Sequence, residues 1–159
     1  MQRDEWTFDG STEVTVNLFS MHAFHLLVGK KVPNQKWLLD QRASFKKFFS
    51  KQPTYHDWQN DYGMALATFA QLIKHFGWQP MYKFMKEYEA DIRNQNDLPH
   101  SNQEKIDQWV LRYSRILKRN IKPQFQMFGL PVSERCDHEL ALYQSWIVEG
   151  EKNPDKFFN

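Results

Sequence analysis

The chain has 159 residues, about the length of one domain and enough to bury one hydrophobic core. Its 21 lysine and arginine residues against 19 aspartate and glutamate residues give a formal net charge of +2. This balance excludes the strongly basic surface that is typical of nucleic-acid-binding proteins. The longest largely apolar stretches, such as Met64 to Ala70, are far shorter than the ~20 residues that a membrane-spanning helix needs.

The cysteine content and the N-terminus exclude two further classes. Cys136 is the one cysteine of the sequence, so an internal disulfide and a cysteine-rich zinc module are both ruled out. The residues Met1 to Glu5 lack the apolar region of a signal peptide, so the sequence indicates no targeting segment. Aromatic residues make up 16% of the chain, which favours an ordered globular protein.

Hydrophobic periodicity predicts the fold class. Apolar residues recur at the 3.6-residue spacing of a helix in most segments and do not alternate for long, so we expect an all-α helical bundle. The first helix should begin after Asp9-Gly10, with Ser11 or Thr12 as its N-cap. It should end at Gly29, because glycine is the residue that most often terminates a helix. Glu13 then lies in the first turn.

The next two helices are separated by a polar connection. Val32-Pro33-Asn34 breaks the chain, and an amphipathic helical segment is expected from Trp37 to Phe49. A third helix is predicted from about Asp61 to His75, ending near Gly77. Its apolar residues lie nearly all round the helix, which indicates a central position in the bundle.

Two further helices carry clear start signals. Gln79-Pro80 has the pattern of an N-cap followed by proline in the first turn, and the helix that begins here should fray near Asn94. Ser101 and Glu104 have the spacing of a capping box and predict a helix that continues to Leu117.

The C-terminal part is expected to be helical as well. A short helix should run from Pro123 to Gly129, and Ser133 should cap a last helix that reaches Ile147. We expect residues 1–150 to form the folded unit and residues 151–159 to be a loosely held tail.

Histidine patterns offer two candidate metal sites, and a structural interpretation is favoured for both. His138-Glu139 resembles the start of an HExxH zinc motif, but Leu142 stands where the second histidine ligand would be. His22 and His25 share a helix face and could bind a metal if a third ligand approached. The sequence shows no such ligand, so partly buried core histidines are the favoured interpretation.

The segment Trp6-Thr7-Phe8-Asp9-Gly10-Ser11-Thr12-Glu13-Val14-Thr15-Val16-Asn17-Leu18 resembles the stretch that follows the HExxH helix in enhancin and mucinase-type zinc metallopeptidases. These proteins are peptidase family M-sixty, of the gluzincin class. The resemblance implies that Glu13 is the third zinc ligand. Asn17 lies one turn later on the same helix face and could hold a ligand in place by a hydrogen bond. Trp6 and Phe8 are weaker candidates for the rim of the substrate cleft.

The resemblance extends over roughly residues 1–147. Its later motifs include Phe76-Gly77-Trp78-Gln79-Pro80, Asn96-Asp97-Leu98-Pro99 and Phe128-Gly129, in the order of the same domain. The vertebrate TRP channel-associated factors, which carry a related domain, are also similar. The loop from Asp97 to His100 is a further candidate for the cleft rim.

The chain departs from the family at its zinc motif. In the family, HExxH lies immediately before the residues matched by Met1-Gln2-Arg3, and none of the 6 histidines here supplies the missing pair. Such peptidases use three protein ligands to hold Zn²⁺ with one open position for a water, and the glutamate of HExxH is the general base. We therefore expect this chain alone to be inactive and to bind no zinc tightly.

Two functions from different classes follow. The resemblance implies a secreted or cell-surface zinc peptidase that acts on glycoproteins, with mucin-like substrates, once the HExxH half is present. The alternative is a non-catalytic helical interaction module like the channel-associated factors, which are intracellular at the membrane. In both cases the first helix should expose the apolar face that meets the HExxH helix, so self-association through this face is expected. The reading frame upstream of Met1 would discriminate the two functions.

Overall fold

The computed structural model describes residues 3–32 and 40–148. Over these ranges the regular secondary structure is helical, and Asn120 and Ser145 form an isolated parallel β-bridge. The predicted all-α class is therefore confirmed. No helix within the described ranges is long and apolar enough to cross a membrane.

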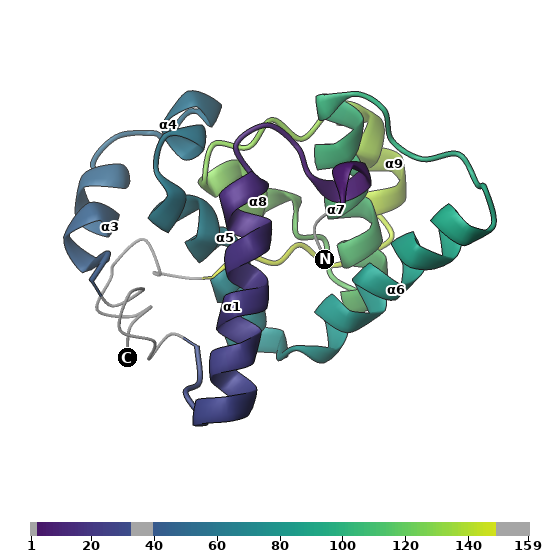
Figure 1. Cartoon of the computed structure of the whole chain (residues 1–159). Helices are drawn as coiled ribbons and strands as arrows, with labels where there is room; N and C mark the ends of the chain where they lie inside the picture. Colours follow the sequence, from purple (N-terminus) through teal and green to yellow (C-terminus); the bar gives the residue numbers. More distant parts are fainter. Residues whose placement is uncertain (1–2, 33–39, 149–159) are drawn as a thin grey trace.

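The helices pack around α5, at the centre of the bundle. Figure 1 shows α1 lying across α5, with α3 and α4 on one side and α6 and α7 on the other, in agreement with the contacts between elements. In chain order the elements are η1 (Asp4–Trp6), α1 (Thr12–Val28), α3 (Arg42–Phe48), α4 (Tyr55–Gln59), α5 (Tyr62–Phe76), α6 (Gln79–Arg93), α7 (Asn102–Leu117), α8 (Lys122–Met127), η2 (Glu134–Cys136) and α9 (Asp137–Leu140).

Helix α5 has the central position that its sequence predicted. The side chain of Asp61 accepts a hydrogen bond from the backbone N–H of Met64 at 3.1 Å and so caps the start of the helix. Every residue from 64 to 73 is buried. The backbone N–H of Gly77 donates to the carbonyl oxygen of Ile73 and closes the last turn. A helix that is apolar all round is stable only when other elements cover all its faces.

The predicted ends of α1 and α7 are also confirmed. Ser11 is the N-cap of α1, and Gly29 ends it with a left-handed backbone at φ 69°. At the start of α7, the hydroxyl of Ser101 accepts from the N–H of Glu104 at 3.2 Å. The carboxylate of Glu104 accepts from the N–H of Ser101 at 2.9 Å, which completes the capping box. These signals are local, and the structure uses them as the sequence indicated.

Tryptophan 109 (Trp109) joins three elements in the core. Its ring is fully buried and stacks on Phe84 of α6, with ring centroids 3.9 Å apart. Its indole N–H donates to the backbone carbonyl of Trp6 at 2.7 Å, so the N-terminal segment is held against α7. Burial of a large ring together with a satisfied N–H makes such a residue a strong source of stability.

A short helix occurs in the connection that we predicted to be polar. Helix α4 begins after Thr54, whose side chain accepts from the N–H of Asp57 at 3.2 Å. The carboxylate of Asp57 in turn accepts from the N–H of Thr54 at 2.9 Å. This capping box was visible in the sequence as Thr and Asp three residues apart, and its short helix places Trp58 in the core.

The predicted last helix, from Ser133 to Ile147, is wrong beyond Leu140. The hydroxyl of Ser133 donates to Asp107 of α7 at 2.6 Å, and the turn after it is the short η2 followed by α9. Beyond Leu140 the chain turns, and the N–H of Trp146 donates to the carbonyl of Asn120 at 2.8 Å. The loop after α7 therefore supplies the backbone partners that a longer helix would have supplied to itself.

Three other expectations fall partly or wholly outside the described residues. Helix α3 covers 42–48 of the predicted segment 37–49, whose first three residues are not described. The break at 32–34 is described only at Val32. The tail at 151–159 lies outside the described residues.

Gly129 is expected to tolerate no side chain. Its φ is 87°, and a Cβ there would lie 2.6 Å from the carbonyl oxygen of Thr54. We expect Gly129→Ala to lower the free energy of unfolding by about 2–4 kcal/mol, because backbone strain and a backbone clash add. Gly29→Ala is the matched control, since Gly29 has φ 69° but open space around it; its cost should be about 1 kcal/mol. Equal urea midpoints for the two variants would contradict this account.

Candidate functional site

Helix α1 has one face packed on the bundle and one face turned outward. Val14, Leu18 and Met21 lie at helical spacing and are buried, and α1 packs mainly on α5. At 100° per residue, Glu13 and Phe24 lie on the opposite side from Leu18. The helix therefore presents a second surface, away from the core.

This second surface combines polar and apolar side chains. We define the outward face of α1 as Glu13, Val16, Asn17, Phe24 and Leu27. Val16, Phe24 and Leu27 are 42%, 48% and 84% exposed, and Glu13 is exposed as well. Asn17 is half-buried, one turn after Glu13. The structure thus brings Glu13 and Asn17 together on one strip, next to apolar residues that a soluble helix surface ordinarily lacks.

The exposed rings and methyl groups of this face are expected to drive self-association. Burial of large apolar side chains between two copies would be favourable, because each removes apolar area from water. We expect the chain to associate in sedimentation experiments and the double variant Phe24→Lys with Leu27→Lys to remain monomeric. Leu142→Lys is the control, since Leu142 is 74% exposed but lies outside α1. Association that survives the double variant would assign it to another surface.

A series of contacts fixes the segment that leads into α1. The guanidinium of Arg3 donates to Glu89 of α6 at 2.7 and 2.9 Å. The ammonium of Lys105 on α7 lies 3.0 Å from the carboxylate of Asp4. These ion pairs, together with the hydrogen bond from the indole N–H of Trp109 to the carbonyl of Trp6, hold residues 3–6 against α6 and α7. The position of the first turn of α1 is thereby set by helices far away in the sequence.

The last residues before α1 are tied to α4 and α7. The hydroxyl of Tyr55 donates to the carbonyl of Asp9 at 2.6 Å. The N–H of Asp9 donates to the side-chain oxygen of Asn102 at 2.6 Å. The first turn of α7, which follows the loop from Asp97 to His100, is therefore joined directly to the turn that precedes Glu13.

Trp6 and Phe8, the weaker candidates for a cleft rim, are buried in the described structure. Both side chains are 2% exposed. The ring of Trp6 packs edge-on against Tyr88 at 5.6 Å, and the ring of Phe8 stacks with Trp58 at 5.4 Å. Large aromatic rings are more stable in a core that has room for them than on a surface, and here they anchor the segment that leads to Glu13.

The loop from Asp97 to His100 is exposed, as a rim would require. The ring of His100 lies 3.5 Å from the carboxylate of Asp97, and both side chains are largely in solvent. They line a shallow hollow of about 250 Å³ together with Glu104 and Gln108 of α7. The exposure of these side chains is compatible with a cleft rim beside α7. Contact of Asp97 and His100 with a substrate stays a prediction.

Asp91 fixes the start of this loop. Its carboxylate accepts from the side-chain amide of Asn96 at 2.8 Å and from Arg112 of α7 at 2.6 Å. The hydrogen bond from Asn96, followed by that from Arg112, lowers the pKa of Asp91 from its usual value. Arg112 also lies over the ring of Tyr88, 4.2 Å from its centroid, so the ion pair is well positioned.

Acid should weaken the interactions of Asp91 with Asn96 and Arg112. Because the folded state holds the pKa of Asp91 below its ordinary value, the stabilisation is present above that value and is lost as the pH falls through the lowered pKa. We expect the urea midpoint to fall between about pH 5 and pH 2, and to fall less in Asp91→Asn. Glu134→Gln, on the exposed turn η2, is the control and should keep the wild-type slope. If the urea midpoints of Asp91→Asn and of the wild type fell in parallel as the pH is lowered, Asp91 would not be the source of the acid sensitivity.

Histidines 22 and 25 belong to an aromatic cluster between α1 and α6. The ring of His22 is hydrogen-bonded to the hydroxyl of Tyr82 and lies 4.9 Å from the ring of Trp78. Burial, followed by the nearby His25, lowers the pKa of His22. Both histidines are half-buried, in agreement with the favoured structural interpretation.

A complete metal site is not formed by the described residues. Over residues 3–32 and 40–148, no group of three or more His, Cys, Asp and Glu side chains is placed to hold a metal ion. Glu13 belongs to no such group within the described residues, and its role as a zinc ligand stays a prediction. His138 lies in the short helix α9, and Leu142 beyond it is 74% exposed.

Comparison with known proteins identifies the family. The family described as Peptidase M60, enhancin and enhancin-like matches residues 1–129. The chain belongs to this family. The resemblance found in the sequence is thereby confirmed.

Individual relatives of this enhancin-like chain are longer than it is. It is 30% identical over 151 residues to TRPM8 channel-associated factor 1 of Homo sapiens, a match that covers 91% of this chain and 16% of the factor. It is 29% identical over 161 residues to TRPM8 channel-associated factor 2 of Bos taurus, with 99% and 16% covered. The chain thus spans about a sixth of the length of these relatives.

A solved structure has the same fold. A functionally unknown conserved protein from Bacillus anthracis str. Ames superposes with a TM-score of 0.71 at 25% sequence identity. The match covers 96% of this chain and 30% of the Bacillus protein. The helical arrangement described above is therefore found as one part of a longer chain.

Proposed function

We propose that this chain forms the helical half of an enhancin-like zinc peptidase domain and presents Glu13 as a zinc ligand. The observation that carries the proposal is the outward face of α1, where Glu13 lies one turn before Asn17 and next to the exposed Val16, with the exposed Phe24 and Leu27 about three to four turns further along the same face. A carboxylate within an exposed apolar strip has the chemistry expected of a helix that packs against a second, metal-binding helix.

In this proposal the zinc ligands are divided between this chain and a second segment. Catalytic zinc sites use three protein ligands, and Glu13 supplies one carboxylate. The HExxH segment of the family would supply the two imidazoles. We therefore expect this chain alone to bind no stoichiometric zinc and to be inactive. Asn17 would hold the Glu13 carboxylate or a neighbouring ligand by a hydrogen bond.

Membership of the family supports a substrate class. We infer that the assembled domain hydrolyses peptide bonds in glycoproteins, with mucin-like substrates. The loop from Asp97 to His100, joined through Asn102 to the turn before α1, lies where it could line one side of such a cleft. Its two polar side chains are available for hydrogen bonds to a glycosylated peptide.

A fusion experiment tests the proposal. The HExxH-containing segment of an enhancin-like relative is placed before residue 1, and zinc content is measured by elemental analysis alongside mucin digestion. We expect about one zinc per fused chain and no stoichiometric zinc in the chain alone. A fusion that is folded and monomeric but holds no zinc would refute the assignment of Glu13. Stoichiometric zinc in the chain alone would refute it as well.

The second candidate function is a non-catalytic helical interaction module. The similarity to TRPM8 channel-associated factors favours it, because these relatives match over nearly the whole chain. In that case the outward face of α1 would be a packing surface and Glu13 would be dispensable. A folded fusion that binds zinc but digests no mucin would favour the module, whereas digestion that depends on Glu13 would favour the peptidase.

A further inference from the structure

The C-terminal end of α1 projects from the bundle. In Figure 1 the last turns of this helix extend beyond the other described helices. We define the tip of α1 as Phe24, Leu26, Leu27 and Val28, whose side chains are 48%, 64%, 84% and 57% exposed. Four large apolar side chains within five residues form a patch that monomeric proteins rarely leave in water.

The apolar side chains of the tip surround most of the helix. Successive residues of a helix are turned by about 100°, so Leu26 and Val28 lie about 100° to either side of Leu27. The tip is therefore apolar over roughly 200° of its circumference. A helix that packs on one neighbour needs an apolar stripe of only about 100°. One neighbouring helix would thus leave Leu26 or Val28 in water, whereas a continuous apolar medium would cover the whole tip.

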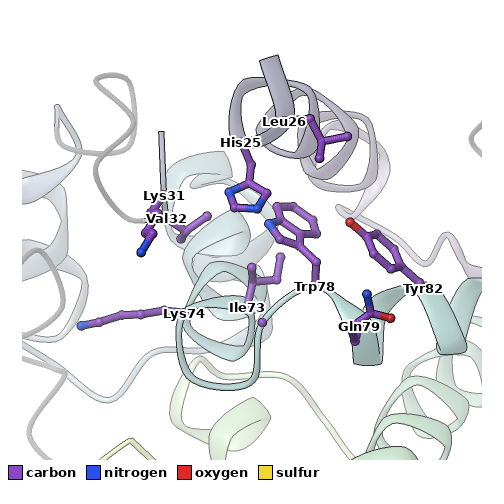
Figure 2. Close-up of a pocket in the computed structure, with 10 residues that line it drawn as sticks. His25, Leu26, Lys31, Val32, Ile73, Lys74, Trp78, Gln79 and Tyr82 are labelled. Carbon is purple, nitrogen blue, oxygen red and sulfur yellow. The ribbon is translucent and has the colours of Figure 1, made fainter. Parts of the chain in front are cut away.

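The remaining side of this end of α1 is attached to the bundle. His25 lies on the opposite side of the helix from Leu27, and Figure 2 shows its ring pointing toward Trp78, with the ring centroids 6.1 Å apart. A hollow of about 490 Å³ lies beside these two rings, between the ends of α1 and α5 and the start of α6. Met21, one turn earlier, is fully buried. The helix is therefore already formed and held in place, and a partner of the tip need not order it.

The residues next to the tip are cationic. Lys30 and Lys31 follow Val28 by two and three residues, so their Cα atoms lie within roughly 11 Å of that of Val28. Both lysine side chains are exposed. The sequence has no aspartate or glutamate between Glu13 and Asp40, and none of the described residues that line the neighbouring hollow is acidic. The charge at this end of α1 therefore favours an anionic partner.

We propose that the tip of α1 inserts into the surface of a bilayer that contains anionic phospholipids. The four apolar side chains of the tip would enter the boundary between the headgroups and the acyl chains. Lys30 and Lys31 would contact the anionic headgroups. Burial of apolar area and attraction to anionic lipids add in this kind of interfacial binding, and stable attachment ordinarily needs both.

Contact of the tip with a bilayer is compatible with a zinc ligand at Glu13. Leu27 is 14 residues after Glu13, which corresponds to roughly 21 Å along the helix axis. The first turns of α1 would therefore stay free to pack against a second helix. The proposal does not depend on the function of Glu13, and Glu13→Ala should bind vesicles as the wild type does.

Co-sedimentation of the full chain with lipid vesicles tests the electrostatic part of the proposal. One preparation is pure phosphatidylcholine, and in the other about one-quarter of the lipid is phosphatidylserine. We expect binding to be about ten-fold or more stronger with phosphatidylserine, because each lysine near an anionic surface contributes about a five-fold factor. The double variant Lys30→Gln with Lys31→Gln should lose this preference. Lys46→Gln with Lys47→Gln, an exposed pair of adjacent lysines on α3, is the matched control and should keep it.

The double variant Leu26→Gln with Val28→Gln tests the apolar part. Both side chains are exposed, so the variant should keep the wild-type thermal melt, and its binding to the anionic vesicles should fall by about ten-fold or more. It retains Phe24 and Leu27, on which self-association is expected to depend. Leu142→Gln changes an exposed leucine outside α1 and should bind as the wild type does.

Three results would overturn the proposal. The first is equal binding to the two vesicle preparations, or binding to neither, because the lysines would then recognise no anionic lipid. The second is undiminished vesicle binding by Leu26→Gln with Val28→Gln. The third is loss of self-association in that variant without loss of vesicle binding, which would assign the tip of α1 to an interface between two copies of the chain.

Discussion

Glu13→Ala is expected to abolish stoichiometric zinc in the fused domain that carries an HExxH segment. The substitution removes one of three protein ligands, and loss of a ligand should weaken zinc by more than the ~10–100-fold typical of losing a residue that supports a ligand. Mucin digestion should be lost together with the metal. Elemental analysis of dialysed protein and a competition titration with a zinc chelator measure the two quantities.

Two matched variants give this prediction its specificity. Asn17→Ala should weaken zinc by roughly 10–100-fold, because a hydrogen bond that orients a ligand is lost while the ligand itself remains. Glu139→Ala removes a glutamate from the false HExxH start in α9 and should leave zinc and digestion unchanged. Activity that survives Glu13→Ala would show that another carboxylate is the ligand.

Trp109→Ala is expected to unfold much of the population at room temperature. The ring is fully buried between α6 and α7, and its removal should cost about 3–5 kcal/mol through lost burial and the remaining cavity. The carbonyl of Trp6 would also lose its hydrogen-bond donor. Such a loss is a large part of the total stability of a domain of this size.

Trp109→Phe separates these two contributions. Phenylalanine keeps a ring against Phe84 but cannot donate to the carbonyl of Trp6, so we expect a smaller loss of about 1–3 kcal/mol. Urea unfolding followed by circular dichroism measures both variants. If Trp109→Ala were as stable as Trp109→Phe, stacking on Phe84 would contribute nothing measurable to the packing of α6 on α7.

Much of the helical framework was predictable because its signals are local. The capping box at Ser101 and Glu104, the terminating Gly29 and the all-round apolar pattern of α5 each act within a few residues of where they stand. They were read correctly from the sequence. The short α4 carried a local signal as well, in Thr54 and Asp57, and it was overlooked.

The errors arose where distant residues decide the structure. Ser133 is of a residue type that often caps helices, but its hydroxyl and its backbone N–H both donate hydrogen bonds to the carboxylate of Asp107 in α7. Residues beyond Leu140 could continue a helix, yet the loop at Asn120 pairs with them instead. Periodicity within one segment contains no information on these partners, because they lie far away in the sequence.

The candidate site shows the same division. The shared face of Glu13 and Asn17 follows from helical spacing and was predicted. The burial of Trp6 and the hollow beside Trp78 depend on how α1, α5, α6 and α7 meet, and the sequence did not predict them.

The anchoring of the N-terminal segment has a consequence for folding kinetics. Its contacts join residues that are far apart in the sequence, with a separation of 86 residues for Arg3 and Glu89 and of 103 for Trp6 and Trp109. Closing such long loops costs entropy that local helical contacts do not require, and it slows the steps that depend on it. The surface around Glu13 therefore acquires its final orientation only after α6 and α7 have paired. During synthesis, residues 3–6 emerge before α6 and α7 and reach their native positions only after those helices have formed.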